Sequence, residues 1–342
     1  MPLSAYAGIL MWRNEGLSTY HFITDIMDTI RQGVGIPFHR RENPLRNVGS
    51  GAYQALRQDI AVREVCSSLE KSYLNDRIGK PATGRVAVVT GATGGIGQAL
   101  VRRMIGCGYQ VIILSRQAQV DMPGVTPVVC DLTNMDSICQ AAGTITRHAP
   151  QLDVIVHCAG IITPRPVGQM GTQEIADQIA VDLTAPIELT NALLPAMRRG
   201  GHIVFVNSMA AVFPLAGSSV YTAAKFGLRG FARALEQELR PRRIQVSSIY
   251  PASVNTPMLR HEMDAGGSIY NFIDQPQEPD VTAQRILECC ERSSREIFSS
   301  VFDKLFTHAC LASQGLLNLS LPVMKILGRM GYRTYKRRAS RN

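Results

Sequence analysis

The residues best suited to chemistry are a tyrosine, a lysine and a serine that lie close together in the chain. Tyr221 and Lys225 are four residues apart, and Ser208 lies thirteen residues before the tyrosine. If the chain is helical from Val220 onward, this spacing places the phenol and the ammonium on one helix face. An ammonium beside a phenol favours the phenolate and lowers its pKa. With a serine hydroxyl to hold a substrate oxygen, the three side chains suit proton transfer coupled to hydride transfer.

A glycine-rich turn earlier in the chain supports this interpretation, because chance alone places many tyrosine–lysine pairs on solvated helix faces. The β-branched run 86–89 predicts a buried parallel strand and leads into segment 90–97, which has glycines at 91, 95 and 97. Glycine lets a chain turn tightly and approach a ligand closely. The helix expected to follow would point unpaired N–H groups at an anion. Between a strand and a helix, the turn predicts a pyrophosphate site.

Six short motifs occur in an order and at spacings typical of one family. They are Thr90-Gly-x-x-x-Gly-Ile-Gly97, Asp131-Leu132, Ala159-Gly160, Asn207-Ser208, Tyr221-x-x-x-Lys225 and Pro251-x-x-x-Asn255-Thr256. In these motifs the chain resembles the short-chain dehydrogenase/reductases, over residues 84–300, about two thirds of its length. The resemblance implies an α/β fold, a Rossmann-like doubly wound parallel sheet with helices on both faces. Helical N- and C-terminal extensions would be added to it.

The hydrophobic pattern of the chain agrees with that fold. After the first strand, short apolar runs predict strands at 110–114, 126–130, 154–156, 202–206 and 245–249. Helical patterns are clearest at 134–147, 183–197 and 220–239. Strands that alternate with helices are typical of a parallel α/β sheet.

The resemblance also implies a role for each matched position. Tyr221 would be the general acid/base, Lys225 would lower its pKa and bind the nicotinamide ribose, and Ser208 would orient the substrate carbonyl or hydroxyl. Asp131 would meet the adenine, with Leu132 beside it. The other positions implied in cofactor binding are Thr90, Gly91, Gly95, Ile96 and Gly97 at the turn, Ala159, Gly160 and Pro251, and Thr256, which would meet the nicotinamide carboxamide.

The end of the second predicted strand indicates which cofactor is bound. An NAD enzyme of this fold tends to place an acidic residue there for the ribose 2′-hydroxyl. This chain has Ser115 and Arg116 instead. A hydroxyl and a planar, multi-donor guanidinium suit a 2′-phosphate. We therefore expect NADP(H) to be preferred over NAD(H), although a surface arginine in a loop is the alternative.

Three segments depart from the family pattern, at four positions. His157 and Cys158 replace two asparagines, Ala252 replaces a glycine, and Asp182 occupies a position where the family commonly has the asparagine of the proton relay. An amide both donates and accepts, whereas an ionised carboxylate only accepts. We expect Asp182 either to pair with Lys225 or to stay protonated, and either would alter how the lysine tunes the phenol. For His157 we favour a satisfied histidine at a strand end over a pH-sensitive group near the adenine.

Composition sets further bounds on the protein. The chain of 342 residues carries eight cysteines without a Cys-x-x-Cys pair, which indicates reduced thiols, an intracellular protein and no metal site. We divide it into an N-terminal extension at 1–83, a catalytic domain at 84–301 and a C-terminal segment at 302–342. The N-terminal part does not resemble the family, and we expect helices at 17–30 and 53–73, joined by an extended arm. A mitochondrial address is one interpretation of this part, but its acidic residues argue against a simple transit peptide, and an arm that reaches over a neighbouring protein is at least as plausible.

The net charge of +9 is concentrated at the C-terminus. Asp303 is the last acidic residue, and eight lysines and arginines follow it. Residues 305–324 carry no charge, but their polar residues and Pro322 favour an interfacial helix pair over a membrane span. Apolar and cationic residues at 305–341 suit a membrane surface or a membrane-bound complex. The alternatives are simple packing on the core and, least favoured, nucleic-acid binding, because no nucleic-acid fold accompanies the tail.

Two classes of function remain open from the sequence. The first is an NADP(H)-dependent oxidoreductase that reduces a carbonyl, or oxidises an alcohol, of an apolar and lipid-like substrate. The second is a nucleotide-binding accessory subunit of a membrane-bound complex with little or no activity. Ser208, Tyr221 and Lys225 favour the first class, and Asp182 and the unmatched ends favour the second. The family resemblance also implies a homodimer paired through the helix that carries Tyr221.

Overall fold

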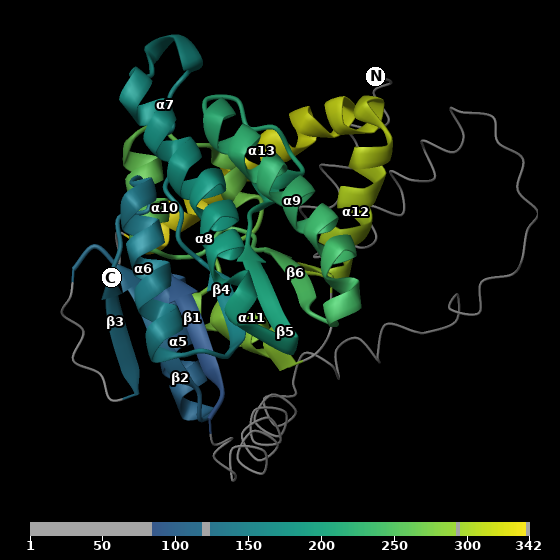
Figure 1. Cartoon of the computed structure of the whole chain (residues 1–342). Coiled ribbons are helices and arrows are strands. Elements are labelled where there is room, and N and C mark those ends of the chain that lie inside the picture. Colours follow the sequence, from purple (N-terminus) through teal and green to yellow (C-terminus); the bar gives the residue numbers. More distant parts are fainter. Residues whose placement is uncertain (1–83, 118–123, 292–294, 340–342) are drawn as a thin grey trace, which may run out of the picture. The chain divides into compact units, whose positions relative to one another are not determined.

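A seven-stranded parallel sheet forms the centre of the described part of the chain (Figure 1). The computed structural model describes residues 84–117, 124–291 and 295–339, so the helices and arm expected before residue 84 lie outside the described residues. The strand order is β3-β2-β1-β4-β5-β6-β7. All strands are parallel, and β1 to β3 are added toward one edge of the sheet, whereas β4 to β7 are added toward the other. The strands are β1 (Val86–Thr90), β2 (Gln110–Ser115), β3 (Val125–Val129), β4 (Leu152–His157), β5 (Met197–Val206), β6 (Gln245–Tyr250) and β7 (Glu296–Phe298).

Helices cover both faces of the sheet, which confirms the doubly wound architecture. The central strands are apolar on both sides, and every residue of β4 is buried. On one face α6, α8 and α9 pack their apolar residues on the sheet, and on the other α5 and α11 do so. The α-helices of this body are α5 (Gly95–Gly106), α6 (Met135–His148), α7 (Thr172–Ile179), α8 (Ala185–Leu193), α9 (Ser219–Leu239), α10 (Pro257–Asp264) and α11 (Pro279–Glu291).

Short helical turns lie between the helices and strands, and one of them takes the place of the first residues of a predicted helix. The helix expected at 183–197 is α8, which is shorter, and the five residues before it form a π-helical turn. A π turn is rare in proteins, but where it occurs it is often at a functional site. This one contains Asp182. The turns are η1 (Val167–Gln169), the π turn η2 (Ala180–Thr184), η3 (Leu194–Ala196), η4 (Met209–Ala211), η5 (Arg240–Arg242) and η6 (Ile269–Phe272).

The C-terminal segment forms two helices, α12 (Val301–Ala312) and α13 (Gln314–Ala339). Neither they nor any other helix in the described ranges has the length and apolar character needed to cross a bilayer. In Figure 1 α13, in bright yellow, runs behind α9. It packs against η6, in the segment that follows the sixth strand. The helical C-terminal extension is thus built onto the catalytic body.

Candidate active site

The predicted triad comes together at the carboxyl end of the sheet. Tyr221 and Lys225 lie one turn apart at the start of α9, and the Lys225 Nζ is 5.4 Å from the centre of the Tyr221 ring. Ser208 follows β5, and its hydroxyl accepts a hydrogen bond from the Ala210 amide at 3.1 Å. The same serine side chain hydrogen-bonds the Tyr221 phenol. Asn207 holds this strand end, since its side-chain oxygen accepts from the Ser208 amide and its nitrogen donates to the Lys225 carbonyl.

Burial, rather than the neighbouring ammonium, dominates the ionisation of the phenol. Desolvation raises the pKa of Tyr221, and the charges of Asp182 and Glu262 raise it further, whereas Lys225 and the Ser208 hydrogen bond lower it. The net direction is upward, so the lowered pKa expected from the sequence is not found in this structure. The lysine acts in the expected direction but does not outweigh burial. The phenol is therefore held in its protonated, proton-donating form.

Asp182 is fully buried and forms an ion pair with Lys225, one of the two states expected from the sequence. Its Oδ1 lies 3.4 Å from the Lys225 Nζ and accepts a hydrogen bond from the Ile161 amide at 3.1 Å. Its Oδ2 is buried with no hydrogen-bond partner in the structure. Burial raises the pKa of the Asp182 carboxyl, and the lysine partly opposes that rise. The carboxylate is thus paired with Lys225 and has spare accepting capacity.

Lys225 stays charged because of its neighbours. Burial alone lowers the pKa of Lys225, but the Asp182 and Tyr221 charges more than offset that effect, and the net pKa is raised. Space beside the pair is tight, since a Cβ added at Gly160 would lie 2.9 Å from the Asp182 Oδ1. The predicted cofactor-lining position Gly160 therefore leaves room for the carboxylate.

The glycine-rich turn has a geometry that only glycine can adopt at two positions. Gly91 has a φ of 67°, and a Cβ there would lie 2.6 Å from the Ala159 Cα. A Cβ at Gly97 would overlap the Gly91 carbonyl oxygen. Helix α5 begins at Gly95, with no acidic residue in its first turn and no side chain capping it. Its first N–H groups are therefore free to meet a pyrophosphate, and these residues fit a dinucleotide.

Two polar residues beside this turn are structural. The Thr90 hydroxyl accepts hydrogen bonds from both the Cys158 and Ala159 amides, each at 3.1 Å, and so joins the end of β1 to the loop after β4. His157 is buried, stacks on Phe205 at 4.9 Å and shares a hydrogen bond with Thr190. Burial lowers the pKa of His157 to about 3. The histidine is thus a neutral residue at the end of β4. Its Nδ1 is buried without a hydrogen-bond partner, so the satisfied histidine expected from the sequence is found only in part.

The remaining predicted cofactor positions lie around the carboxyl edge of the sheet. Ser115 ends β2, and Arg116 follows it, exposed. Asp131 and Leu132 follow β3, and the Asp131 carboxylate accepts hydrogen bonds from Thr133. Thr256 and Ile96 belong to facing helix starts, where Thr256 caps α10 and its methyl group lies against Gly95.

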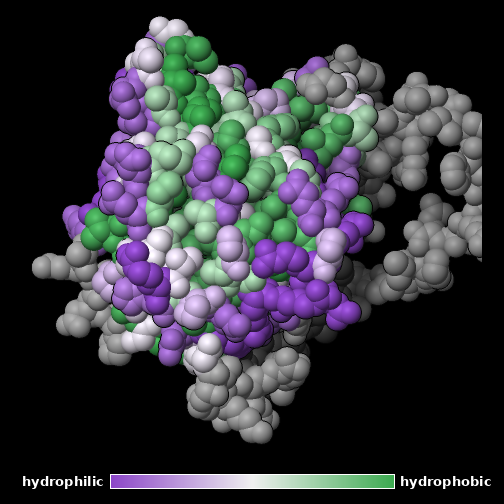
Figure 2. Space-filling view, in the orientation of Figure 1, coloured by the Kyte–Doolittle hydropathy of each residue, from purple (hydrophilic) through white to green (hydrophobic). Residues whose placement is uncertain are grey.

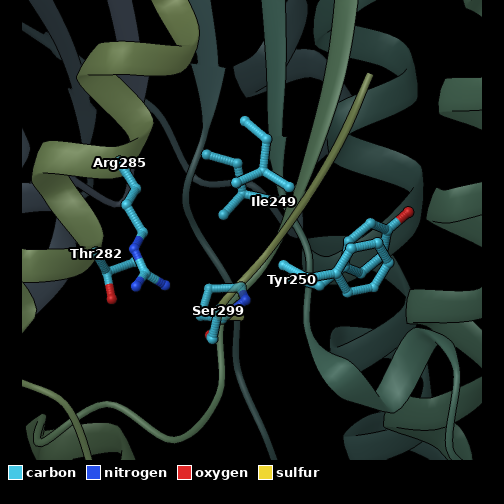
Figure 3. A pocket seen from close by; sticks show the side chains of 8 residues that line it. Ile249, Tyr250, Thr282, Arg285 and Ser299 are labelled. Carbon is cyan, nitrogen blue, oxygen red and sulfur yellow. The ribbon is translucent and has the colours of Figure 1, made fainter. Parts of the chain in front are cut away.

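The predicted residue Pro251 lines a shallow hollow between α11 and the ends of β6 and β7. Figure 3 shows Arg285 and Thr282 on the α11 side of this hollow and Ser299 on the other. The Ser299 hydroxyl accepts a hydrogen bond from the Ala252 amide at 2.9 Å. None of the triad residues lines the hollow. The Ser299 hydrogen bond holds the loop that follows β6, and the hollow is separate from the triad.

Two residues near the site carry no motif and were not expected. Glu262 of α10 is buried, accepts hydrogen bonds from the Asn271 side chain at 2.7 Å and from the Ser268 amide, and acts electrostatically on Tyr221. Gln178 of α7 is fully buried, and its side-chain oxygen accepts from the Thr163 amide at 2.9 Å. No spacing rule marks either residue, because both reach the site through the fold. Among the described residues, no cluster of three potential ligands could hold a metal ion.

Comparison with known proteins agrees with this geometry. A family model described as short chain dehydrogenase matches residues 85–265. The chain is 29% identical over 238 residues to the Drosophila melanogaster dehydrogenase/reductase SDR family protein 7-like, covering 64% of this chain and 73% of that one. It is 36% identical over 185 residues to the human dehydrogenase/reductase SDR family member 2, mitochondrial, covering 50% and 66%.

Solved structures share the fold. A short chain dehydrogenase from Burkholderia cenocepacia in complex with NADP superposes with a TM-score of 0.59 and 22% identity, covering 70% of this chain and 97% of that one. A 3-ketoacyl-(acyl-carrier-protein) reductase from Brucella melitensis, complexed with NADH, gives 0.56 and 22%, covering 63% and 96%. The fold therefore accommodates either nicotinamide cofactor.

Proposed function

Because this chain belongs to the short-chain dehydrogenase family, we propose that it is an NADP(H)-dependent oxidoreductase that interconverts a carbonyl and an alcohol on an apolar, lipid-like substrate. The observation that carries the proposal is the buried set of Ser208, Tyr221 and Lys225 beside a turn suited to a dinucleotide. A proton donor placed next to a nicotinamide site is what carbonyl reduction requires. Asp182 keeps the lysine charged within this set.

In the reducing direction, the bound cofactor supplies the hydride to the carbonyl carbon. The Ser208 hydroxyl donates a hydrogen bond that orients the carbonyl oxygen, and the Tyr221 phenol delivers its proton to that oxygen. The resulting phenolate is stabilised by the Lys225 ammonium, whose pKa is raised by its neighbours. In the oxidising direction the phenolate removes the proton of the alcohol. Burial of all the charged groups excludes water and strengthens these interactions.

The surroundings of the phenol support an apolar substrate. Tyr221 packs with Ile162, Ala210 and Leu215, and none of these side chains offers a polar group. Figure 2 shows hydrophilic residues gathered across the lower part of the view, while apolar residues are more frequent above, toward the carboxyl ends of the strands in Figure 1. A substrate with one carbonyl and an otherwise apolar body suits these surroundings.

The position of Arg116 supports the choice of NADP(H). It follows β2 next to Ser115, and both side chains are accessible to a ligand at the edge of the sheet. The pKa of Asp131 is lowered mainly by its hydrogen bonds from Thr133 and in small part by the charge of Arg116, so the arginine lies near the expected adenine region. A guanidinium there would bind a 2′-phosphate by charge-assisted hydrogen bonds.

The test is a turnover assay of the purified full-length chain with NADPH or NADH and a series of ketones and aldehydes of increasing chain length. We expect oxidation of NADPH that rises with the apolar character of the substrate. The Tyr221→Phe variant is the control for background oxidation. Tight nucleotide binding without turnover on any carbonyl or alcohol would contradict the proposal and would favour the accessory role.

A further inference from the structure

The inner face of α13 is set by close backbone packing. A Cβ at Gly328 would overlap the Ile269 carbonyl, and a Cβ at Gly331 would overlap the Phe272 carbonyl, so the helix lies directly on η6. The fully buried Phe272 ring packs with Tyr332 and Tyr335, with ring centres 5.0 Å and 4.9 Å away. These contacts leave the helix no freedom to rotate about its axis. The face opposite η6 is therefore directed away from the catalytic body.

That outer face carries large apolar side chains. Leu319 is 49% exposed, Ile326 is 48% exposed and Met330 is 44% exposed. Ile326 and Met330 are four residues apart and lie on one side of the helix, and Leu319 is seven residues before Ile326, with Pro322 of the same helix between them. Because the glycine contacts fix the rotation of α13, these side chains cannot be buried by a small turn of the helix. Their exposure belongs to the packed state of the helix.

Cations flank the apolar stripe. Arg329 lies three residues after Ile326, and Arg333 lies three after Met330 and seven after Ile326, so both are neighbours of the stripe on the helix surface. Both arginines are exposed. Lys325 and Lys336 add further exposed positive charge, and α13 contains no acidic residue. The outer face therefore combines apolar side chains with positive charges that no acidic residue of the helix balances.

We propose that the outer face of α13, formed by Leu319, Ile326, Met330, Arg329 and Arg333, docks on the surface of an anionic lipid membrane. The helix would lie in the plane of the interface, with its apolar stripe among the acyl chains and its arginines at the lipid phosphates. Nucleic acid would satisfy the arginines but would leave the stripe in water. An apolar protein groove would satisfy the stripe but not the unopposed charge.

Docking in this orientation would bring η6 and α10 near the membrane. Helix α13 rests on η6, and η6 is tied to α10 through the hydrogen bond from Asn271 to Glu262. The charge of Glu262, on α10, raises the pKa of Tyr221, so α10 lies near the phenol. A lipid-like substrate would then have a short route from the bilayer. The docking itself does not depend on the proposed reaction.

The test is co-sedimentation of the full chain with vesicles of phosphatidylcholine alone or of phosphatidylcholine with phosphatidylserine. We expect the parent to bind the phosphatidylserine vesicles, and to bind less as salt is raised. Ile326→Ser with Met330→Ser should weaken binding at least about tenfold because the apolar insertion is lost. Arg329→Gln with Arg333→Gln should weaken it about 30-fold at low salt and flatten the salt dependence. Thermal unfolding and nucleotide binding of each variant check that the fold is kept.

The matched control is Val129→Ser with Val281→Ser, which removes two apolar side chains of similar exposure from β3 and α11. It should bind vesicles as the parent does. A parent that stays in the supernatant with phosphatidylserine vesicles would overturn the proposal, as would α13 variants that bind like the parent. If the serine pair does not fold, the glutamine pair decides. Vesicle binding without turnover would leave docking intact and count only against the proposed reaction.

Discussion

The two halves of the candidate site depend on different parts of the chain: one on backbone geometry and the other on ionisable side chains. The turn at 90–97 acts through backbone, since it needs the positive φ of Gly91 and the missing Cβ of Gly97. The proton-relay half acts through three buried ionisable side chains, Tyr221, Lys225 and Asp182. A backbone-built site either forms or does not form. A site built from coupled charges can change its working pH through one substitution, here the aspartate, while the fold stays the same.

The largest expected effect breaks the relay half and spares the turn. Tyr221→Phe removes the proton donor without removing the ring that packs with Ile162 and Ala210. Turnover should fall by about 10²–10⁴-fold. The affinity for NADPH, measured by fluorescence titration, should stay within about twofold of the parent because the turn is untouched. Turnover that persists within a few-fold would show that another group is the acid.

The reverse effect comes from the other half of the site. Arg116→Ala should weaken NADPH binding by about 1.5–3 kcal/mol, through loss of a charged hydrogen bond, and should leave NADH binding unchanged. Titration of both cofactors with parent and variant measures the difference. Arg102→Ala on α5, another exposed arginine, is the matched control. A parent with equal affinity for the two cofactors would contradict the preference for NADP(H).

A smaller effect tests the backbone nature of the turn. Gly97→Ala places a methyl group against the Gly91 carbonyl and should cost about 1–3 kcal/mol, shared between stability and NADPH affinity. Gly106→Ala is the control, because it lies in the same helix with open space around its Cβ position and no close neighbour. Thermal unfolding and fluorescence titration of both variants separate the two contributions. Equal behaviour of the variants would show that the turn tolerates a side chain.

The smallest effect on rate, and the sharpest test of the relay, is Asp182→Asn. The amide oxygen can accept from Ile161 and Lys225 as the carboxylate does, so the fold and the maximal rate should be kept. The Asp182 charge raises the pKa of Tyr221. Its removal lowers that pKa directly while Lys225 keeps its ammonium charge, which the Tyr221 phenolate also supports, so the pH midpoint of alcohol oxidation, which needs the phenolate, should move to lower pH.

The control for this shift is Asp153→Asn. Asp153 is also buried and ion-paired, with Arg198 at 2.8 Å, but it does not act on Tyr221. Its removal should leave the pH profile unchanged. A large loss of rate in Asp182→Asn, with cofactor still bound, would show that the relay depends on the carboxylate itself.

Much of the fold could be predicted because its signals are local. The β-branched run of β1, the glycines after it and the periodicity of α9 each specify an element without reference to distant residues. Strand β7 was missed because three residues carry no usable alternation, and its place depends on pairing with β6. The π turn at Asp182 was missed because it arises within an otherwise helical pattern.

The site was predicted less completely than the fold, for electrostatic reasons. Spacing placed Tyr221 beside Lys225 correctly, but the direction of the phenol's pKa depends on total burial, which spacing does not report. The pairing of Asp182 with Lys225 was one of two expected states, and only the packing around Gly160 and Ile161 selects it. Glu262 enters from α10 and is marked by no motif.

The double hydrogen bond to Thr90 has a consequence for local motion. One hydroxyl holds the amides of Cys158 and Ala159, so the loop that follows β4 cannot open unless it also separates from the end of β1. The phosphate turn and the loop leading to Ile161 and the carboxylate should therefore exchange their amide hydrogens as one cooperative unit. Fluctuations at the nucleotide end of the candidate site would then be transmitted to its Tyr221 end through a single oxygen atom.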